Sequence, residues 1–221
     1  MNFSASLMNM NLLNLGSDIR IIDPFVSNYH IDILDWHYVE NLGLTPLIAK
    51  SIRPITKKPI EGHIYMDEIN ESLINLCIDC GIDIVTVPSD IVGRHVNRLA
   101  NLIHRKNKKF GVFLNPSQPI SIIEEYSNLL DQLIILSVDP GFSGQTFISS
   151  TYHRVEQAVN LRKLTKSNFR ITVDGNCNKH NFQKLKDSGA DTVVLGRSLF
   201  NDDTNLKRSV ISINNDIQEL N

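Results

Sequence analysis

Gly81-Ile82-Asp83-Ile84-Val85 is the stretch that decides the fold, and Gly189-Ala190-Asp191-Thr192-Val193 repeats its pattern. In both stretches a glycine ends a helical segment, and the apolar and β-branched residues that follow begin a strand. A chain that passes repeatedly from helix to strand is expected to build a parallel sheet joined by helical crossovers.

The same alternation extends in both directions along the chain. Eight strands are predicted, over residues 3–7, 29–33, 60–64, 82–87, 110–114, 132–138, 170–173 and 192–195. Helices are predicted between them, over residues 11–22, 46–52, 70–80, 91–106, 120–130, 149–164, 179–188 and within 204–220. Eight such units in 221 residues, with no linker, favour an α/β fold of one domain over residues 1–221, a single (β/α)8 TIM barrel.

Composition excludes several classes of function. The 22 Lys and Arg against 24 Asp and Glu leave no basic excess for binding nucleic acid or an anionic membrane. No apolar run is long enough to span a membrane, and no signal peptide is evident. Cys77 and Cys80 form a C-x-x-C pair without the second pair that a zinc site needs, so we interpret them as core residues rather than redox or metal groups. A cytoplasmic setting is expected.

Polar, ionisable and glycine-rich residues follow most of the predicted strands. In a barrel of this kind the active site lies at the carboxyl ends of the strands. The residues found there are Ser6; His30, Asp32 and Asp35; His63; residues 139–145; residues 174–176; and residues 196–198. We therefore expect the functional site at this end.

His30 and Asp32 lie on the same face of their predicted strand, because side chains alternate between the two faces. Taken alone, the pair could simply be hydrogen-bonded or solvated. With His63 and Asp174, however, it supplies two imidazoles and two carboxylates, a full ligand set for a divalent ion that leaves room for substrate oxygens. One divalent metal ion, either Zn, Mn, Fe, Co or Mg, is therefore predicted.

Three glycine-bearing loops follow the sixth, seventh and eighth predicted strands. Gly141, Gly144, Gly175 and Gly196 could each be an ordinary turn residue. Together they allow backbone N–H groups to approach an anion, and the loops after strands seven and eight are the usual phosphate cradle of this barrel. A substrate with a phosphate at one end and chelating oxygens at the other is a phosphorylated sugar.

The two carboxylates suggest the reaction. A metal bound to a ketone oxygen stabilises the enediolate that forms when the neighbouring carbon loses its proton. If Asp32 and Asp174 lie on opposite faces of the sugar, one can remove the proton and the other can return it, so that configuration inverts.

Spaced motifs run along nearly the whole chain: Ser4-Ala5-Ser6-Leu7, His30-Ile31-Asp32-Ile33-Leu34-Asp35, Asn41-Leu42, His63, Leu114-Asn115-Pro116, Val138-Asp139-Pro140-Gly141-Phe142-Ser143-Gly144-Gln145 with Phe147-Ile148, and Val173-Asp174-Gly175. In these motifs the chain resembles the ribulose-phosphate 3-epimerase family, above all in the run over residues 138–145. Within the family it is most similar to the D-allulose-6-phosphate 3-epimerases, in Ser6-Leu7-Met8, Met10, Leu12-Leu13, Val173-Asp174-Gly175-Asn176-Cys177-Asn178 and Leu199-Phe200-Asn201.

The resemblance implies a TIM barrel and a role for each site residue. It implies metal ligands at His30, Asp32, His63 and Asp174, with Asp32 as proton acceptor and Asp174 as proton donor. Ser6 and His63 would contact the substrate. Its phosphate would lie on Gly141, Phe142, Ser143, Gly144, Gly175, Asn176, Gly196, Arg197 and Ser198. A homo-oligomer is also expected.

The predicted activity is metal-dependent C3 epimerisation of D-allulose 6-phosphate to D-fructose 6-phosphate. The first alternative is the ribulose 5-phosphate 3-epimerase of the pentose phosphate pathway. A second alternative, from another class, is a sugar-phosphate-binding protein with little or no catalysis.

The departures from the family motivate this second alternative. Leu34, Tyr65 and Leu136 replace methionines that commonly line the family's pocket, and Trp36 and Glu40 replace a glycine and a proline. The predicted metal ligands are all retained.

Overall fold

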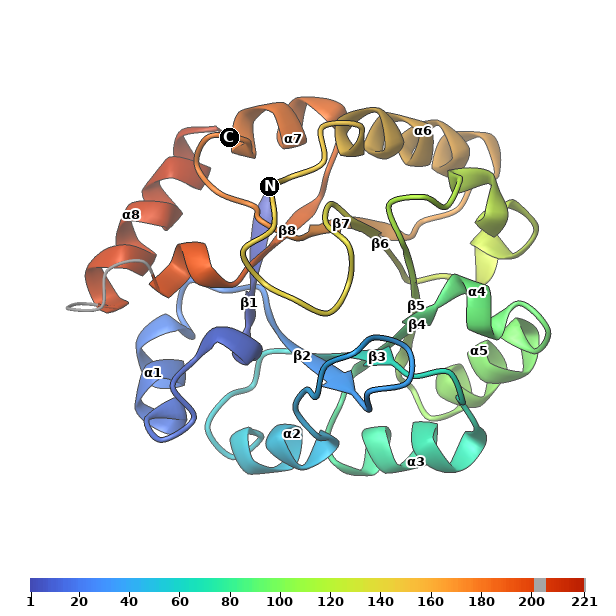
Figure 1. Cartoon of the computed structure of the whole chain (residues 1–221), viewed down its shortest axis with the longest axis horizontal. Helices are drawn as coiled ribbons and strands as arrows, with labels where there is room; N and C mark the ends of the chain where they lie inside the picture. Colours follow the sequence, from blue (N-terminus) through green and yellow to red (C-terminus); the bar gives the residue numbers. More distant parts are fainter. Residues whose placement is uncertain (201–205, 221) are drawn as a thin grey trace.

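Eight parallel strands close into a barrel in chain order, with β8 paired to β1 (Figure 1). The computed structural model describes residues 1–200 and 206–220. The strands are β1 (Asn2–Ser6), β2 (Asn28–Leu34), β3 (Ile60–Tyr65), β4 (Ile84–Pro88), β5 (Lys109–Leu114), β6 (Gln132–Leu136), β7 (Arg170–Asp174) and β8 (Thr192–Leu195). The predicted (β/α)8 barrel is confirmed, and every predicted strand overlaps an observed one.

Helices form a ring around the barrel (Figure 1). They are α1 (Leu15–Ile22), α2 (Pro46–Ile52), α3 (Glu71–Asp79), α4 (Ser89–Val92), α5 (Val96–Arg105), α6 (Thr151–Leu164), α7 (Phe182–Ser188) and α8 (Leu206–Glu219), with 3₁₀ segments η1 (Leu7–Asn9), η2 (Ile120–Leu129) and η3 (Arg197–Phe200). Thr204, in the range predicted to contain the last helix, and Asn201, in a family motif, lie outside the described residues. No helix of the described ranges is long and apolar enough to cross a membrane.

Two predicted helices differ from the structure. The helix predicted over residues 91–106 is two helices, because the chain turns at residues 93–95 and His95 leaves the helical region (φ −145°) before α5 begins. Gly93, a weak helix former, lies at this break. The helix predicted over residues 120–130 is the 3₁₀ segment η2, which is interrupted at Tyr126 (φ −128°).

Alternation along β2 divides its side chains between two environments. Tyr29, Ile31 and Ile33 are buried in the apolar layer between strands and helices. Each fully buried aliphatic side chain there contributes about 1.5–3 kcal/mol. His30 and Asp32 alternate with them and lie on the inner face of the barrel. The strand is thus fixed from outside by apolar packing, and this fixes the direction of the polar side chains inside.

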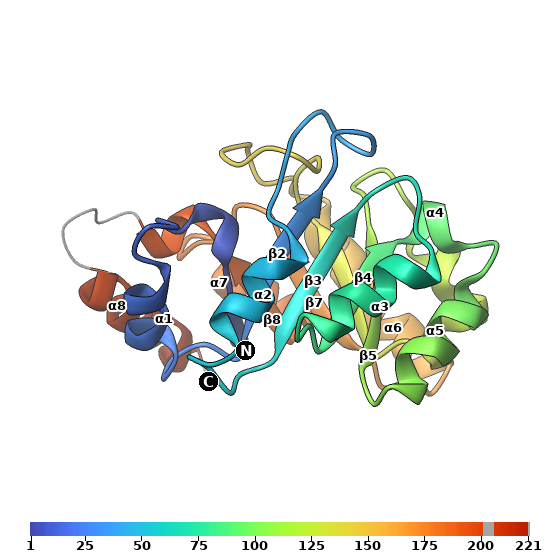
Figure 2. The same cartoon turned by 90° about the horizontal axis from the view of Figure 1, so that it is seen from below.

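Two loops project beyond the carboxyl ends of the strands (Figure 2). One, over residues 35–45, joins β2 to α2, and the other, over residues 137–150, joins β6 to α6. The amide of Asn41 donates a hydrogen bond to the carbonyl of Gly141 and ties the loops together. This end of the barrel is the one at which the sequence predicts the functional site.

Candidate active site

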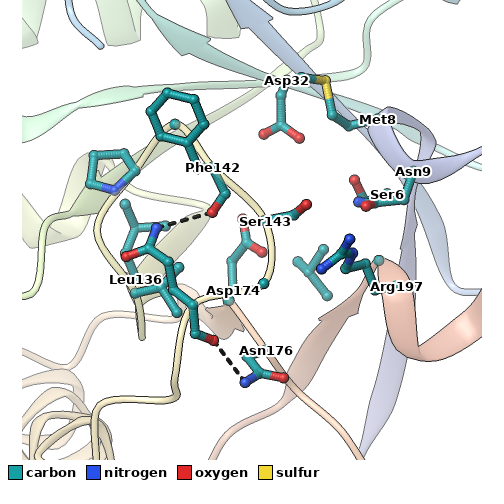
Figure 3. A pocket seen from close by; sticks show the side chains of 18 of the residues that line it. Ser6, Met8, Asn9, Asp32, Leu136, Phe142, Ser143, Asp174, Asn176 and Arg197 are labelled. Atoms are coloured by element: carbon teal, nitrogen blue, oxygen red, sulfur yellow. Dashed lines mark hydrogen bonds between the residues drawn. The ribbon is translucent and has the colours of Figure 1, made fainter. Parts of the chain in front are cut away.

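A cavity of about 360 Å³ opens at the carboxyl ends of the strands. Every predicted substrate-binding residue except His63 lines it, and so does Asp32. Figure 3 shows the carboxyl groups of Asp32 and Asp174 turned toward the open space from different sides. The volume lies within the range of small-molecule sites.

The four predicted metal ligands come together at the base of this cavity. One ligand atom from each of His30, Asp32, His63 and Asp174 lies within 4.8 Å of every other. His30 Nε2 lies 2.8 Å from Asp32 Oδ1 and 3.7 Å from Asp174 Oδ2. Strand register explains the meeting, because Asp32 on β2 pairs with His63 on β3, and the closed barrel brings β7 to the same centre.

The orientation of His63 fits a metal ligand. Its Nε2 lies 2.6 Å from Glu61 Oε1. Its Nδ1 lies 3.6 Å from Asp174 Oδ2 and is buried without a hydrogen-bond partner among the described residues. A buried ring nitrogen left unpaired is unfavourable, and a cation between it and the carboxylates would satisfy it. The donor set of two imidazoles and two carboxylates suits a borderline divalent ion.

The two carboxylates differ in electrostatic surroundings. Burial raises the pKa of Asp32, but the charges of His30 and His63 and hydrogen bonds from His30 and Ser6 outweigh it, so this pKa lies below its usual range. Burial, together with the charge of Asp32, raises the pKa of Asp174 above its usual range. Burial also lowers the pKa of His30, but Asp32 and Asp174 overcome this and raise it to about 9.

Sequence reasoning missed Glu61, which is 1% exposed and lies inside the barrel. Burial raises its pKa, but His63 and the hydrogen bond from Gln132 outweigh this and lower it to about 2. Strand alternation was the pattern that could have found it, because Glu61 precedes His63 by two positions on β3 and therefore shares its inner face.

The loops predicted to hold phosphate meet on one side of the cavity. Gly175 adopts φ +116°, and a Cβ there would come within 2.6 Å of Val138 Cγ2, so glycine is required where the two loops approach. A Cβ on Gly144 would lie 2.6 Å from Nη1 of Arg197, which places that guanidinium against the loop of residues 137–150. The hydroxyl of Ser198 donates to the carbonyl of Cys177 and joins the loops that follow β7 and β8.

The residues that replace the family's methionines gather on one wall. Leu34, Tyr65 and Leu136 line the cavity and form a buried cluster with Phe113. The Tyr65 and Phe113 rings lie 4.6 Å apart. Trp36 is 57% exposed and is not among the residues that line the cavity, whereas Asn41 of the same loop is.

Comparison with known proteins identifies the family. Residues 2–200 match the model of the ribulose-phosphate 3 epimerase family. The chain belongs to this family. Ribulose-phosphate 3-epimerase of Bacillus subtilis is 30% identical over 199 residues, 89% of this chain and 91% of that protein. The chloroplastic ribulose-5-phosphate-3-epimerase of Arabidopsis thaliana is 33% identical over 202 residues, 89% of this chain and 70% of that protein. The chain is accordingly an isomerase of the ribulose-phosphate 3-epimerase family.

Solved structures support the fold. KGPDC from Streptococcus mutans aligns with a TM-score of 0.76 at 13% identity, covering 99% of this chain and 98% of that chain. The 3-hexulose-6-phosphate synthase from Salmonella typhimurium aligns with a TM-score of 0.74 at 12% identity, covering all of both chains. At such low identity these structures establish the barrel fold alone.

Proposed function

We propose that this member of the ribulose-phosphate 3-epimerase family inverts C3 of a ketose phosphate, and that ribulose 5-phosphate is its preferred substrate. The observation that carries the proposal is the meeting of Asp32 and Asp174 across one cavity, from strands on different sides of the barrel. The names of the curated relatives favour ribulose 5-phosphate over the allulose 6-phosphate suggested by the sequence motifs.

In the proposed mechanism the two carboxylates act in turn. Asp32 accepts the C3 proton on one face of the sugar, and Asp174 donates a proton to the opposite face. Their side chains are 18% and 17% exposed, so both are open to the cavity while most of their surface is shielded from water. Exclusion of water strengthens the electrostatic interactions that favour proton transfer.

His30, Asp32, His63 and Asp174 would hold one divalent ion. Such an ion supplies positive charge that stabilises the enediolate formed between the two proton transfers. The mixed donor set, and the Nδ1 of His63 that has no hydrogen-bond partner within residues 1–200 and 206–220, support this part of the proposal.

The phosphate would lie among the loops after β6, β7 and β8. Backbone N–H groups near Gly144, Gly175 and Gly196 can approach an anion closely, and the guanidinium of Arg197 adds a positive charge beside them.

Arg197→Ala should weaken inhibition by inorganic phosphate about 10-fold, the effect of losing one charge-assisted hydrogen bond. Arg98→Ala, on the outer face of α5, is the control and should leave inhibition unchanged. Equal inhibition of both variants by inorganic phosphate would show that Arg197 does not bind the phosphate.

Allulose 6-phosphate is the second candidate, supported by the motifs over residues 6–13 and 173–178. The two candidates are separated by incubating the chelator-treated protein with each divalent ion and each sugar in deuterated water. Incorporation of deuterium at C3 and formation of the epimer are then followed by NMR. Faster exchange with ribulose 5-phosphate supports the proposal, and exchange confined to allulose 6-phosphate supports the second candidate. Binding of either sugar without exchange would show a binding protein and contradict both.

A further inference from the structure

Glu61 is a buried carboxylate that the proposed proton transfers do not use. It lies inside the barrel on β3, two positions before His63 and on the same inner face of the strand. An ionised carboxylate at such a position is costly unless hydrogen bonds surround it. The hydrogen-bond partners of Glu61 therefore indicate its role.

Both oxygens of Glu61 are occupied. Oε1 accepts hydrogen bonds from the amide of Gln132 and from the hydroxyl of Thr86 (3.0 Å), and it lies 2.6 Å from Nε2 of His63. Oε2 accepts a hydrogen bond from the amide of Asn28 (3.1 Å). These partners come from β2, β4 and β6 as well as from β3 itself. The carboxylate is held from several strands and has little freedom to turn away from His63.

The contact between Glu61 and His63 determines which ring nitrogen carries the proton. An ionised carboxylate can only accept, so Nε2 of His63 must donate. In a neutral imidazole Nδ1 then carries the lone pair. Nδ1 is the atom that lies 3.6 Å from Asp174 Oδ2 and is buried without a hydrogen-bond partner among the described residues.

We propose that Glu61 is a positioning residue that fixes the tautomer and ring orientation of His63, so that the Nδ1 lone pair is presented to the ion held by the four-residue cluster. The inference rests on the proposed function, since it needs a divalent ion at this site. Carboxylates behind metal-binding imidazoles commonly act in this way.

The tautomer itself can be observed in the ion-free wild-type protein. Long-range ¹H–¹⁵N NMR distinguishes the two nitrogens of each histidine, and the His63 signals are assigned by their loss in His63→Asn. With spectra recorded over a range of pH, we expect the neutral form of His63 to be the Nε2–H tautomer. The Nδ1–H tautomer in the wild-type protein would overturn the inference, without any need for a Glu61 variant to fold.

Glu61→Gln tests the effect on ion binding. In Glu61→Gln, an NH2 group at the Oε1 position would face the donors of Thr86 and Gln132 and would reverse the His63 tautomer. An NH2 group at the Oε2 position would face the amide of Asn28 and would leave an uncharged carbonyl against His63 Nε2, which makes the imidazole a weaker ligand. Titration with Zn²⁺, Mn²⁺ or Co²⁺ alone should give an affinity about 10- to 100-fold below wild type. Thr86→Val is the matched control, because it removes one hydrogen bond to Glu61 and keeps the contact with His63. It should retain both the tautomer and nearly the wild-type affinity.

The outcomes separate the two levels of the proposal. A wild-type protein that binds none of these ions contradicts the proposed function, and the inference fails with it. Wild-type binding that Glu61→Gln leaves unchanged contradicts the inference alone. Equal weakening by Glu61→Gln and Thr86→Val, with the tautomer unchanged in both, would reduce Glu61 to a structural part of the barrel interior.

Discussion

Asp174 and Asp32 have the same side chain, but their pKa values are shifted in opposite directions. Burial and the neighbouring Asp32 favour the protonated form of Asp174, whereas His30 and His63 favour the ionised form of Asp32. A pair of carboxyl groups with pKa values pushed apart is a familiar basis for dividing acid and base roles. Asp32 gains hydrogen bonds from His30, its neighbour on the inner face of β2, and from Ser6, and these help to offset its burial.

Asp174→Asn should remove epimerisation while leaving the fold intact. Asparagine keeps the shape of the side chain but cannot donate the proton, so turnover should fall by at least about 100-fold, the usual contribution of a general acid. Turnover is measured by coupled assay, and folding by circular dichroism and thermal unfolding. Asp139→Asn, which removes another carboxylate from the cavity wall outside the four-residue cluster, is the control. Full activity in Asp174→Asn would contradict the two-carboxylate mechanism.

Trp36 has a strained backbone. It adopts φ +76°, in the left-handed region that a residue with a Cβ enters at a cost of about 1–2 kcal/mol. Trp36→Gly relieves this strain, whereas Trp36→Ala removes the same ring and keeps the Cβ. After allowance for the greater freedom of glycine in the unfolded chain, Trp36→Gly should be more stable than Trp36→Ala by about 1 kcal/mol. Urea unfolding of both variants measures the difference, and a Trp36→Gly variant less stable than Trp36→Ala by about 0.4–1 kcal/mol, the cost of glycine in the unfolded chain, would show that the strain is absent.

At the scale of elements, the strands were easier to predict than the helices. Thr192–Leu195 and Pro46–Ile52 occur with the predicted bounds, because an apolar β-branched run and a proline at the first helical position define them locally. The break before α5 and the 3₁₀ form of η2 were missed. Helix bounds are set weakly by local propensity and more strongly by packing against the barrel, which the sequence alone does not display.

The residues of the site likewise divide into those that the sequence could predict and those that it could not. Motifs that combine rare residue types, such as His30 with Asp32, could be predicted because their chemistry is visible in the sequence. The contact of Glu61 with Gln132 could not, since the two residues are 71 positions apart and meet only when the barrel closes. Which nitrogen of His63 lies beside Asp174 likewise follows from the folded structure, where Nε2 contacts Glu61.

Arg154 ties α6 to the ends of two strands. It is 7% exposed, and it donates hydrogen bonds to the carbonyls of Leu136, Asn115 and Gln118. Burial lowers its pKa to about 10, so it remains charged at neutral pH. It thereby anchors the start of the loop over residues 137–150, on which the proposed phosphate site depends.

Arg154→Met should lower the free energy of unfolding by about 3 kcal/mol. Methionine fills similar space but removes all three hydrogen bonds, and although the carbonyl of Asn115 still accepts from the N–H of Gln118, each buried group left unsatisfied costs about 1–3 kcal/mol. Lys163→Met, at an exposed position of the same helix, should change stability by less than about 0.5 kcal/mol. Denaturant unfolding compares the two. Similar stabilities would mean that water replaces the guanidinium at these carbonyls.

At the scale of the whole molecule, the barrel combines a polar centre with an apolar ring. The layer between strands and helices is almost wholly apolar, whereas the interior holds Asn28, His30, Glu61, His63 and Gln132. The apolar layer stabilises the closed barrel strongly enough to carry buried polar groups that would otherwise oppose folding. The reactivity of cysteine thiols buried in the fold therefore shows whether this apolar layer is intact.

The three cysteines are all free and buried. Cys77 and Cys80 lie at the end of α3, and Cys177 follows β7. Burial, and to a lesser extent Cys80, raises the pKa of Cys77 to about 12. Burial likewise raises the pKa of Cys177 well above its usual range. Because folding favours the protonated thiol of Cys77, its contribution to stability is present below pH 9 and is lost as pH rises toward about 12.

We therefore expect the native protein to resist labelling by a thiol-specific disulfide reagent, and to expose all three thiols only on unfolding. Reaction requires the thiolate, and the raised pKa of Cys77 keeps its thiolate fraction far below that of an exposed thiol. At both pH values, about 7 and about 8.5, the unfolded chain should therefore be labelled much faster than Cys77 in the native protein. Stopped-flow absorbance with and without denaturant measures both rates, and Cys77→Ala and Cys80→Ala assign them. Rapid native labelling of this pair, or a disulfide between them under mild oxidation, would contradict the core interpretation and favour a redox role.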